Sequence, residues 1–252
     1  MSRKHSGFYD TIEYIGPRPQ KPKRPNIFGG WVILVIALGI GFWFGRPMLS
    51  SLMAAGEKPS IEQAEMLISS LRESNQPGAT LAAAALGRSR DRITFDADYR
   101  RIEYPGGDVA PDRGYAPDVV IRSLRDIGID LQQEVHDDMA ADFRRYPDLW
   151  DAKEPDPNID HRRVANLQRF FERKAQVLTP SREAADYEFG DIVVWSLATA
   201  EKHIGIVVPG PGTRADEPWV VHMLDEKGMK WENILFDFKI EGHFRYPSES
   251  AE

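Results

Sequence analysis

A continuous apolar run near the N-terminus differs from every later apolar stretch of the chain. Residues 27–45 contain no charged side chain and are bracketed by Arg24 and Arg46. A helix of this length spans roughly 28 Å, close to the thickness of the bilayer hydrocarbon. Trp31 and Trp43 stand near its two ends, where indole rings favour the membrane interface. The pattern therefore predicts a single transmembrane helix at residues 27–46.

Apolar positions recur at helical spacing between residues 60 and 175. Ser60 with Gln63 three positions later forms a capping-box pattern at the start of the first such segment. Thr80 is expected to cap a short alanine-rich helix, and Pro117 suits the first turn of another because its missing N–H is not needed there. The expected helices begin at Ser60, run from Thr80 to about Leu86, and cover 117–127, 131–143 and 164–175.

Short β-rich runs separated by Gly, Pro and Asp follow the helical part. They predict strands at 191–195, 203–208, 219–223, 233–238 and 242–246, with a further short strand at 93–95. Helices followed by a meander of strands indicate an α+β domain with helices packed on an antiparallel sheet.

Charge is distributed unevenly along the chain and gives the predicted helix an orientation. The whole chain carries −7, but residues 1–46 hold seven Lys/Arg against two Asp/Glu, which leaves −12 on the remainder. Basic residues stay on the cytoplasmic side of a membrane span. We therefore expect a bacterial inner-membrane protein with a cytoplasmic tail (1–26), the anchor (27–46), a linker (47–59), a periplasmic domain (60–248) and a short C-terminal tail (249–252).

A cleaved signal peptide is the alternative interpretation of the apolar run. The run is long for such a peptide, and the small pair Ala54-Ala55 follows Met53, where a cleavage site requires a small residue. The acidic domain would repel phosphate backbones, which argues against a nucleic-acid partner. The sequence has no cysteine, so disulfides, thiolate metal sites and a thiol nucleophile are excluded. We expect no cofactor.

Three features of the sequence together form a candidate catalytic site. A helix is expected to start directly after Gly114-Tyr115-Ala116, Gly190-Asp191 opens one strand, and His203-Ile204-Gly205-Ile206 opens the next. His222 lies one strand further on, alternating with Val220. In this order the chain resembles the NlpC-like cell-wall cysteine peptidases, which have a papain-like fold, and within them the bacterial domain of unknown function number 1287. The other matching stretches are 104–109, 112–114, 118–122 and 156–164, and the resemblance runs from about Leu81 to Tyr246.

The resemblance implies roles for particular residues and one departure from the family. A thiol at a helix N-terminus is stabilised as thiolate, a histidine takes its proton, and a polar group orients that histidine. By the resemblance, His203 matches the base and His222 the orienting residue, whereas the nucleophile position holds Ala116. Because Pro117 also departs from the family pattern, we favour natural loss of the nucleophile over an engineered Cys-to-Ala substitution.

Other residues are candidates for substrate binding around this site. They are Tyr115, Asp118, His161 and Asp191. His161 could equally cap the following helix together with Asp160, and His136 and His243 are interpreted as structural or exposed. Two nearby histidines could also hold zinc with Asp118 or Asp191 as third ligand, but no H-E-x-x-H spacing supports a metal site.

The resemblance and the departure together predict a membrane-anchored domain that binds peptidoglycan peptides or an envelope protein without cleaving them. It would act as a scaffold or regulator rather than an enzyme. Two alternatives stay open. One is an active cell-wall amidase or peptidase that uses His203 with a non-cysteine nucleophile, and the other is a purely structural envelope assembly protein.

Overall fold

The computed structural model describes Gly16, residues 35–36 and residues 60–247 except 75, 77 and 225–227. The membrane helix predicted at 27–46 lies outside the described residues apart from 35–36. Within the described ranges, no helix combines the length and the apolar character that crossing a bilayer requires. The chain divides into Met1–Glu57 and Lys58–Glu252, and all elements below belong to the second unit.

One antiparallel sheet organises the domain. Its strands stand in the order β3-β8-β4-β5-β6-β7, so that β4 to β7 form a meander and β8 returns to pair with β4. The strands are β3 (Gln176–Leu178), β4 (Ile192–Ser196), β5 (Lys202–Pro209), β6 (Pro218–His222), β7 (Lys230–Glu232) and β8 (Lys239–Arg245). A separate parallel pair joins β1 (Thr94–Phe95) to β2 (Arg113–Gly114).

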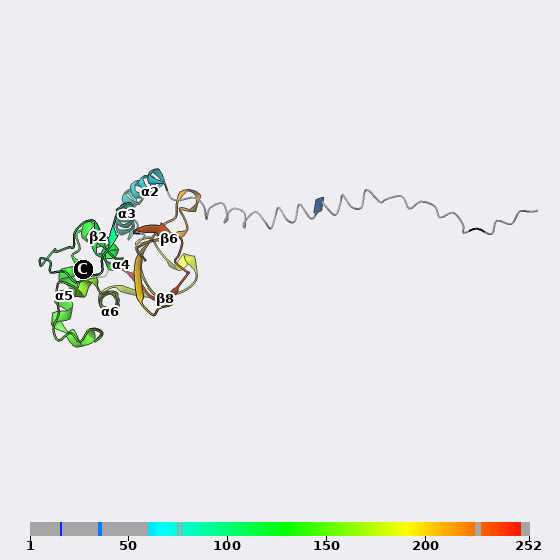
Figure 1. Cartoon of the computed structure of the whole chain (residues 1–252). Helices are drawn as coiled ribbons and strands as arrows, with labels where there is room; N and C mark the ends of the chain where they lie inside the picture. The colour runs from blue at the N-terminus through cyan, green and yellow to red at the C-terminus, as the bar shows by residue number, and fades with distance from the viewer. Residues whose placement is uncertain are drawn as a thin grey trace, which may run out of the picture. The chain divides into compact units, whose positions relative to one another are not determined.

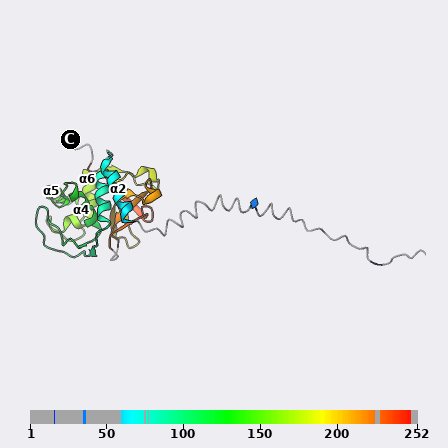
Figure 2. The same cartoon turned by 90° about the horizontal axis from the view of Figure 1, so that it is seen from above.

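The helices of the described part of this unit gather on one side of the sheet, as Figures 1 and 2 show from two directions. They are α2 (Ile61–Glu73), α3 (Ala79–Arg88), α4 (Ala116–Asp126), α5 (Leu131–Ala141) and α6 (Val164–Lys174). Four 3-10 turns connect them and the strands: η1 (Phe143–Arg145), η2 (Asp160–Arg162), η3 (Ala184–Asp186) and η4 (Gly212–Arg214). The predicted α+β class with an antiparallel sheet is confirmed.

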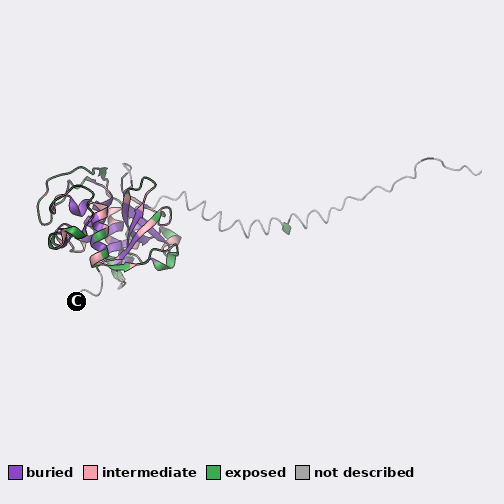
Figure 3. Ribbon diagram, turned by 90° about the horizontal axis from the view of Figure 1, so that it is seen from below, coloured by how far each residue is buried: buried purple, intermediate pink, exposed green. Residues whose placement is uncertain are grey.

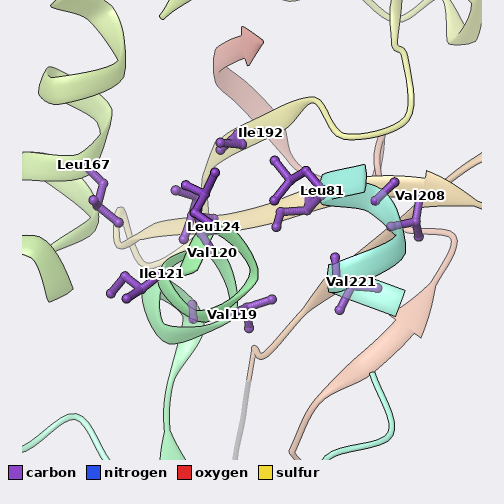
Figure 4. Packing of buried hydrophobic residues seen from close by; sticks show 14 of the residues in the cluster. Leu81, Val119, Val120, Ile121, Leu124, Leu167, Ile192, Val208 and Val221 are labelled. Carbon is purple, nitrogen blue, oxygen red and sulfur yellow. The ribbon is translucent and has the colours of Figure 1, made fainter. Parts of the chain in front are cut away.

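The central helix α4 is enclosed by other elements. Every residue from Ala116 to Leu124 is buried, and Figure 3 shows the buried residues concentrated where helices and strands meet. Val120 and Leu124 belong to one buried cluster with Leu81 of α3 and the sheet residues Ile192 and Val208 (Figure 4). Complete burial of such a side chain contributes about 1.5–3 kcal/mol to folding. The packing therefore fixes α4 firmly against the sheet.

The opposite face of the sheet has its own apolar cluster. Trp195 of β4, Val207 of β5 and Val220 of β6 pack there against Leu235. Leu235 lies in a turn at 235–237 that follows β7, and the indole of Trp195 donates to its carbonyl at 2.9 Å. The predicted strand at 233–238 is therefore wrong. Its apolar residues pack over one face of the sheet and do not form a strand of it.

The remaining differences from the predicted elements are local. The capping box at the start of α2 is confirmed, with Gln63 N–H donating to the Ser60 hydroxyl and the Gln63 side chain accepting from Ser60 N–H. Thr80 is not a cap, because α3 begins at Ala79 after Gly78, which adopts a φ of 78° that favours glycine. The sequence does not predict strands β3 and β7, because three residues each are too few to show the alternation of apolar and polar positions.

A buried ion pair ties the N-terminus of α4 to η2. The Arg162 guanidinium donates to both carboxylate oxygens of Asp118 at 2.9 Å, and to the backbone carbonyls of Asp96 and Asp98. Asp118 in turn accepts the backbone N–H of Tyr115 at 2.8 Å, ahead of the helix. One guanidinium thereby holds three separate stretches of chain together.

Replacing Arg162→Leu should lower the free energy of unfolding by about 3–5 kcal/mol, because Asp118 would become an unpaired buried carboxylate. Arg169→Leu on the outer side of α6 is the matched control, since Arg169 pairs with Glu172 at the surface, and its cost should stay within about 1 kcal/mol. Urea unfolding followed by circular dichroism measures both. Equal losses in the two variants would contradict a structural role for the buried pair.

Candidate functional site

A cavity of about 510 Å³ opens where the N-terminus of α4 faces the start of β5. Tyr115, Ala116 and His203 line it together with loop residues that include Trp150 and Arg163. We call it the main cavity. Ala116 is the first residue of α4 and is 6% exposed, and His203 is 3% exposed. The structure thus brings Ala116, the expected position of a lost nucleophile, and His203, the expected relic base, to one cavity.

His203 begins a chain of ring nitrogens and a carboxylate that runs across three strands. Its Nε2 lies 3.0 Å from Nδ1 of the fully buried His222, whose Nε2 lies 3.1 Å from Oε1 of Glu232. The His203 ring also stacks on Trp195, with ring centroids 5.6 Å apart. These contacts hold the imidazole of His203 in one orientation.

The carboxylate at the end of this chain decides which ring nitrogens carry protons. An ionised Glu232 can only accept, so a neutral His222 between Glu232 and His203 would donate from Nε2 and accept at Nδ1. His203 must then donate from Nε2. Its Nδ1 remains as the nitrogen with a free lone pair, on a side chain that lines the main cavity. This is the tautomer that a proton-accepting histidine needs.

A glycine allows the two histidines to approach. Gly205 pairs with His222 across β5 and β6. A Cβ on Gly205 would lie 2.8 Å from a methyl carbon of Val220, a distance that real Cβ contacts essentially never show, and 3.1 Å from Cβ of His222, which is tighter than most real contacts. The glycine in the H-I-G-I sequence therefore provides the space that His222 occupies beside His203.

Burial determines the protonation state of His203. Loss of hydration, followed by the effect of neighbouring His222, lowers the pKa of His203 to about 3. The imidazole is therefore neutral at neutral pH, with little tendency to accept a proton. A general base works best with a pKa near the operating pH, so the site as it stands is poorly suited to base catalysis.

Tyr115 lies on the main cavity wall, but its phenol is already engaged. The hydroxyl donates to the carbonyl of Arg162, and the guanidinium of that residue lies 4.9 Å from the ring centroid. Burial, and then the nearby carboxylate of Asp118, raises the pKa of Tyr115 to about 12. Tyr115 can therefore shape the cavity, while its phenolate is inaccessible at neutral pH.

The other three candidate binding residues are not among the residues that line the main cavity. Asp118 is buried in the Arg162 ion pair. Asp191 accepts from His243 Nε2 at 2.7 Å and from Arg245 at 2.8 Å, which places it in a buried cluster between β4 and β8. His161 is buried in η2, and burial lowers its pKa to about 3.

Hydrogen bonds and ion pairs also bear on the capping role considered for Asp160 and on the metal-ligand role considered for Asp118 and Asp191. Asp160 does not cap α6, whose N-cap is Arg163 without a side-chain cap bond. Asp118 and Asp191 are each paired with an arginine, and no hydrogen bond joins either of them to His203 or His222. Within the described part of the chain, no group of three or more His, Asp or Glu residues is arranged to hold a metal ion.

Several residues of the site were missed from the sequence. Glu232 lies in the short strand β7, where no periodic pattern marks it, and it becomes significant only through its contact with His222. Trp150 lies in a Pro/Asp-rich loop at residues 146–160, and Arg163 follows this loop closely. Both line the main cavity, with the guanidinium 4.1 Å above the indole. The large aromatic side chain of Trp150 in this loop was the one signal in the sequence for this wall of the main cavity.

Comparison with known proteins identifies the family. Residues 82–246 match the family described as Domain of unknown function (DUF1287), and the chain belongs to it. A relative is the uncharacterized protein YijF of Escherichia coli strain K12. It is 43% identical over 173 residues, which cover 68% of this chain and 83% of that protein.

The depressed pKa values of His203 and His161 predict acid sensitivity. An unfolded histidine titrates near 6.5, so between pH 6.5 and 4.5 the unfolded state binds more protons than the native state. The free energy of unfolding should be greatest above pH 6.5 and decrease by about 1.4 kcal/mol per pH unit for each histidine as the pH falls. Chemical unfolding at a series of pH values measures this slope.

His203→Gln keeps a donor toward His222 and should remove about half of the slope, as should His161→Gln. The double variant should lose most of the slope between about pH 6.5 and 5, above the range in which carboxylates begin to bind protons. A slope that persists undiminished in His203→Gln would contradict the neutral, buried state of His203.

Proposed function

We propose that this protein is a membrane-anchored pseudo-peptidase, with a papain-like, NlpC-type cleft that binds peptidoglycan stem peptides without cleaving them. The observation that carries the proposal is that Ala116 and His203 line one cavity while His203, His222 and Glu232 remain hydrogen-bonded in series. The arrangement for activating a nucleophile is retained, and the nucleophile itself is replaced by a methyl group.

The chemistry of the cleft supports binding without turnover. Ala116 has no atom that can attack a carbonyl. A thiolate at this position would stabilise a protonated histidine, since two opposite charges in contact favour both ionised forms. Without that partner, burial keeps His203 neutral. Loss of the nucleophile and the low basicity of the base are thus two consequences of the same substitution.

The first turn of α4 departs from a catalytic helix N-terminus in a second way. Pro117 is the second residue of the helix and has no N–H. Free N–H groups at a helix N-terminus are what stabilise a thiolate or a developing oxyanion. The first turn of α4 therefore offers one hydrogen-bond donor fewer. This supports the proposal that the helix N-terminus no longer serves catalysis.

We infer the class of ligand from the expected cellular compartment and from the residues around the opening of the main cavity. The positive tail and the apolar run at 27–45 place the domain in the periplasm under this proposal, where the cell wall is the abundant peptide-bearing polymer. Leu149 is 64% exposed, and Trp150 and Phe95 are also exposed beside the main cavity. Exposed apolar groups around a cavity suit the binding of a partly apolar ligand. The same rim would suit a segment of an envelope protein.

One observation favours a second candidate, an active hydrolase. The chain from His203 through His222 to Glu232 is fully formed, as an enzyme with a water or alternative nucleophile would require. The low pKa of His203 counts against this candidate. A purely structural role for the domain is the third outcome that the experiment below distinguishes.

Ala116→Cys should create thiol-dependent hydrolysis of defined stem-peptide muropeptides, because the new thiolate and His203 would form an ion pair that raises the pKa of the histidine. Product formation is followed by mass spectrometry, and the His203 pKa by NMR. Ala116→Ser is the matched control. It should stay inactive, since a neutral histidine of low basicity cannot deprotonate an alcohol.

The unmodified protein should bind these muropeptides and release no products. Turnover by the unmodified protein, abolished by His203→Gln, would replace the proposal with the active hydrolase. Failure of both the unmodified protein and Ala116→Cys to bind any muropeptide would instead favour the structural role.

A further inference from the structure

The main cavity shares part of its lining with a second cavity of about 220 Å³. The shared residues are Trp150 and Arg163. The guanidinium carbon of Arg163 lies 4.1 Å from the centroid of the Trp150 ring, so the indole covers one face of the planar group. Such stacking holds a guanidinium in place and leaves the N–H groups at its edges available.

Most of the hydrogen-bonding capacity of Arg163 is not used within the described part of the chain. A guanidinium has five N–H donors. The side chain of Arg163 makes one hydrogen bond there, from Nη1 to Asp160 Oδ1 at 3.2 Å, and it is 20% exposed. The edge formed by Nε and Nη2 has no acceptor among the described residues. Two parallel N–H donors on one edge match the two oxygens of a carboxylate.

Other arginines of similar or deeper burial are fully engaged. The neighbouring Arg162 donates from Nε, Nη1 and Nη2 to the carboxylate of Asp118 and to backbone carbonyls. Arg245 has the same 20% exposure as Arg163, yet all three of its nitrogens contact carboxylate oxygens. These two arginines hold the fold together, whereas Arg163 keeps one complete edge for a ligand.

The charged groups around the guanidinium leave that edge to an anion. Asp160 is 2% exposed, lines only the second cavity, and also accepts the backbone N–H of Asp156 at 2.6 Å. Lys202 of the main cavity pairs with Glu241 at 2.7 Å, and Glu201 is exposed to solvent, which screens its charge. A ligand carboxylate would therefore meet no buried competing anion among the residues that line the main cavity.

The neighbours of Arg163 also indicate what carries the carboxylate. Apolar residues, among them Val164, Ala165 and Met223, line the main cavity together with Arg163. Such a lining favours an aliphatic group next to the charged one. In addition, α6 begins directly after Arg163 without a side-chain cap, so the positive end of the helix dipole adds to the attraction for an anion.

We propose that Arg163 binds a free carboxylate of the ligand in the main cavity through Nε and Nη2, while Trp150 holds the guanidinium in place. This assignment rests on the proposed function of the cavity, and it names the group by which a stem peptide is recognised there: a carboxylate on an aliphatic residue. An amidated peptide of the same shape would lose the charge-assisted pair of hydrogen bonds.

Two short ligands test carboxylate recognition without any cell-wall fragment. N-acetyl-D-alanyl-D-alanine carries the free carboxylate, and its C-terminal amide has the same shape without the charge. Each is titrated into the full-length protein in detergent while the Nε–H of Arg163 and the indole N–H of Trp150 are followed by NMR. The acid should shift both signals and bind about tenfold more tightly than the amide.

Arg163→Gln removes the cation, keeps a carboxamide that can donate to Asp160, and should abolish the difference between acid and amide. Arg169→Gln makes the same change on the same helix, outside both cavities, and should keep the preference at about tenfold. Arg163→Lys retains the charge and a partner for Asp160 but has no planar fork, so the preference should fall to about threefold. For the variants at position 163 the indole signal of Trp150 is the readout.

Equal affinities for acid and amide in the unmodified protein, or a tenfold preference that persists in Arg163→Gln, would overturn the carboxylate site. Muropeptide binding that persists in that case would leave the proposed function standing. A preference that depends on Arg163 without muropeptide binding would have the opposite meaning. N-acetyl-L-alanyl-L-alanine distinguishes the source of the carboxylate. If it binds more tightly than the D-form, the site recognises the end of a protein chain, and the cell-wall ligand is rejected.

Discussion

The buried guanidinium of Arg162 is the contact on which the geometry of the site depends. It pairs with Asp118 in the first turn of α4 and with two backbone carbonyls before β2, while its own carbonyl receives the Tyr115 hydroxyl. An ion pair shut away from water persists only when hydrogen bonds satisfy both partners. These bonds fix where α4 begins and therefore where Ala116 meets the main cavity.

The sheet contributes the other half of the site through its second face. His203 lies over Trp195, and Glu232 is brought to His222 by the strand β7, just before the turn that seals this face with Leu235. An apolar surrounding for two imidazoles keeps His203 neutral. Such a site can activate a nucleophile only if the nucleophile itself supplies the charge, and Ala116 does not.

The sequence predicted the helices well and the site in part. Helical spacing and the Ser60 cap marked α2, α4 and α6, because their buried faces repeat over three turns. The run at 233–238 was misread, since apolar residues that cover a sheet and residues that form a strand share one composition. The sequence predicts Asp118 and Asp191 as substrate-binding residues, but each is paired with an arginine 44 or 54 residues away, a separation that no local pattern reveals. Glu232 has no signal in the sequence because its strand β7 has only three residues, too few to show a periodic pattern.

The central claim is that the cleft recognises a peptide and performs no chemistry on it. The most direct test is a titration of the unmodified full-length protein in detergent with defined stem-peptide muropeptides, followed by mass spectrometry of the same mixture. The account predicts saturable binding, with shifts in the resonances of His203 and Met223 of the main cavity, and complete recovery of the intact muropeptide. Cleaved products that accumulate with time and disappear in His203→Gln would contradict it.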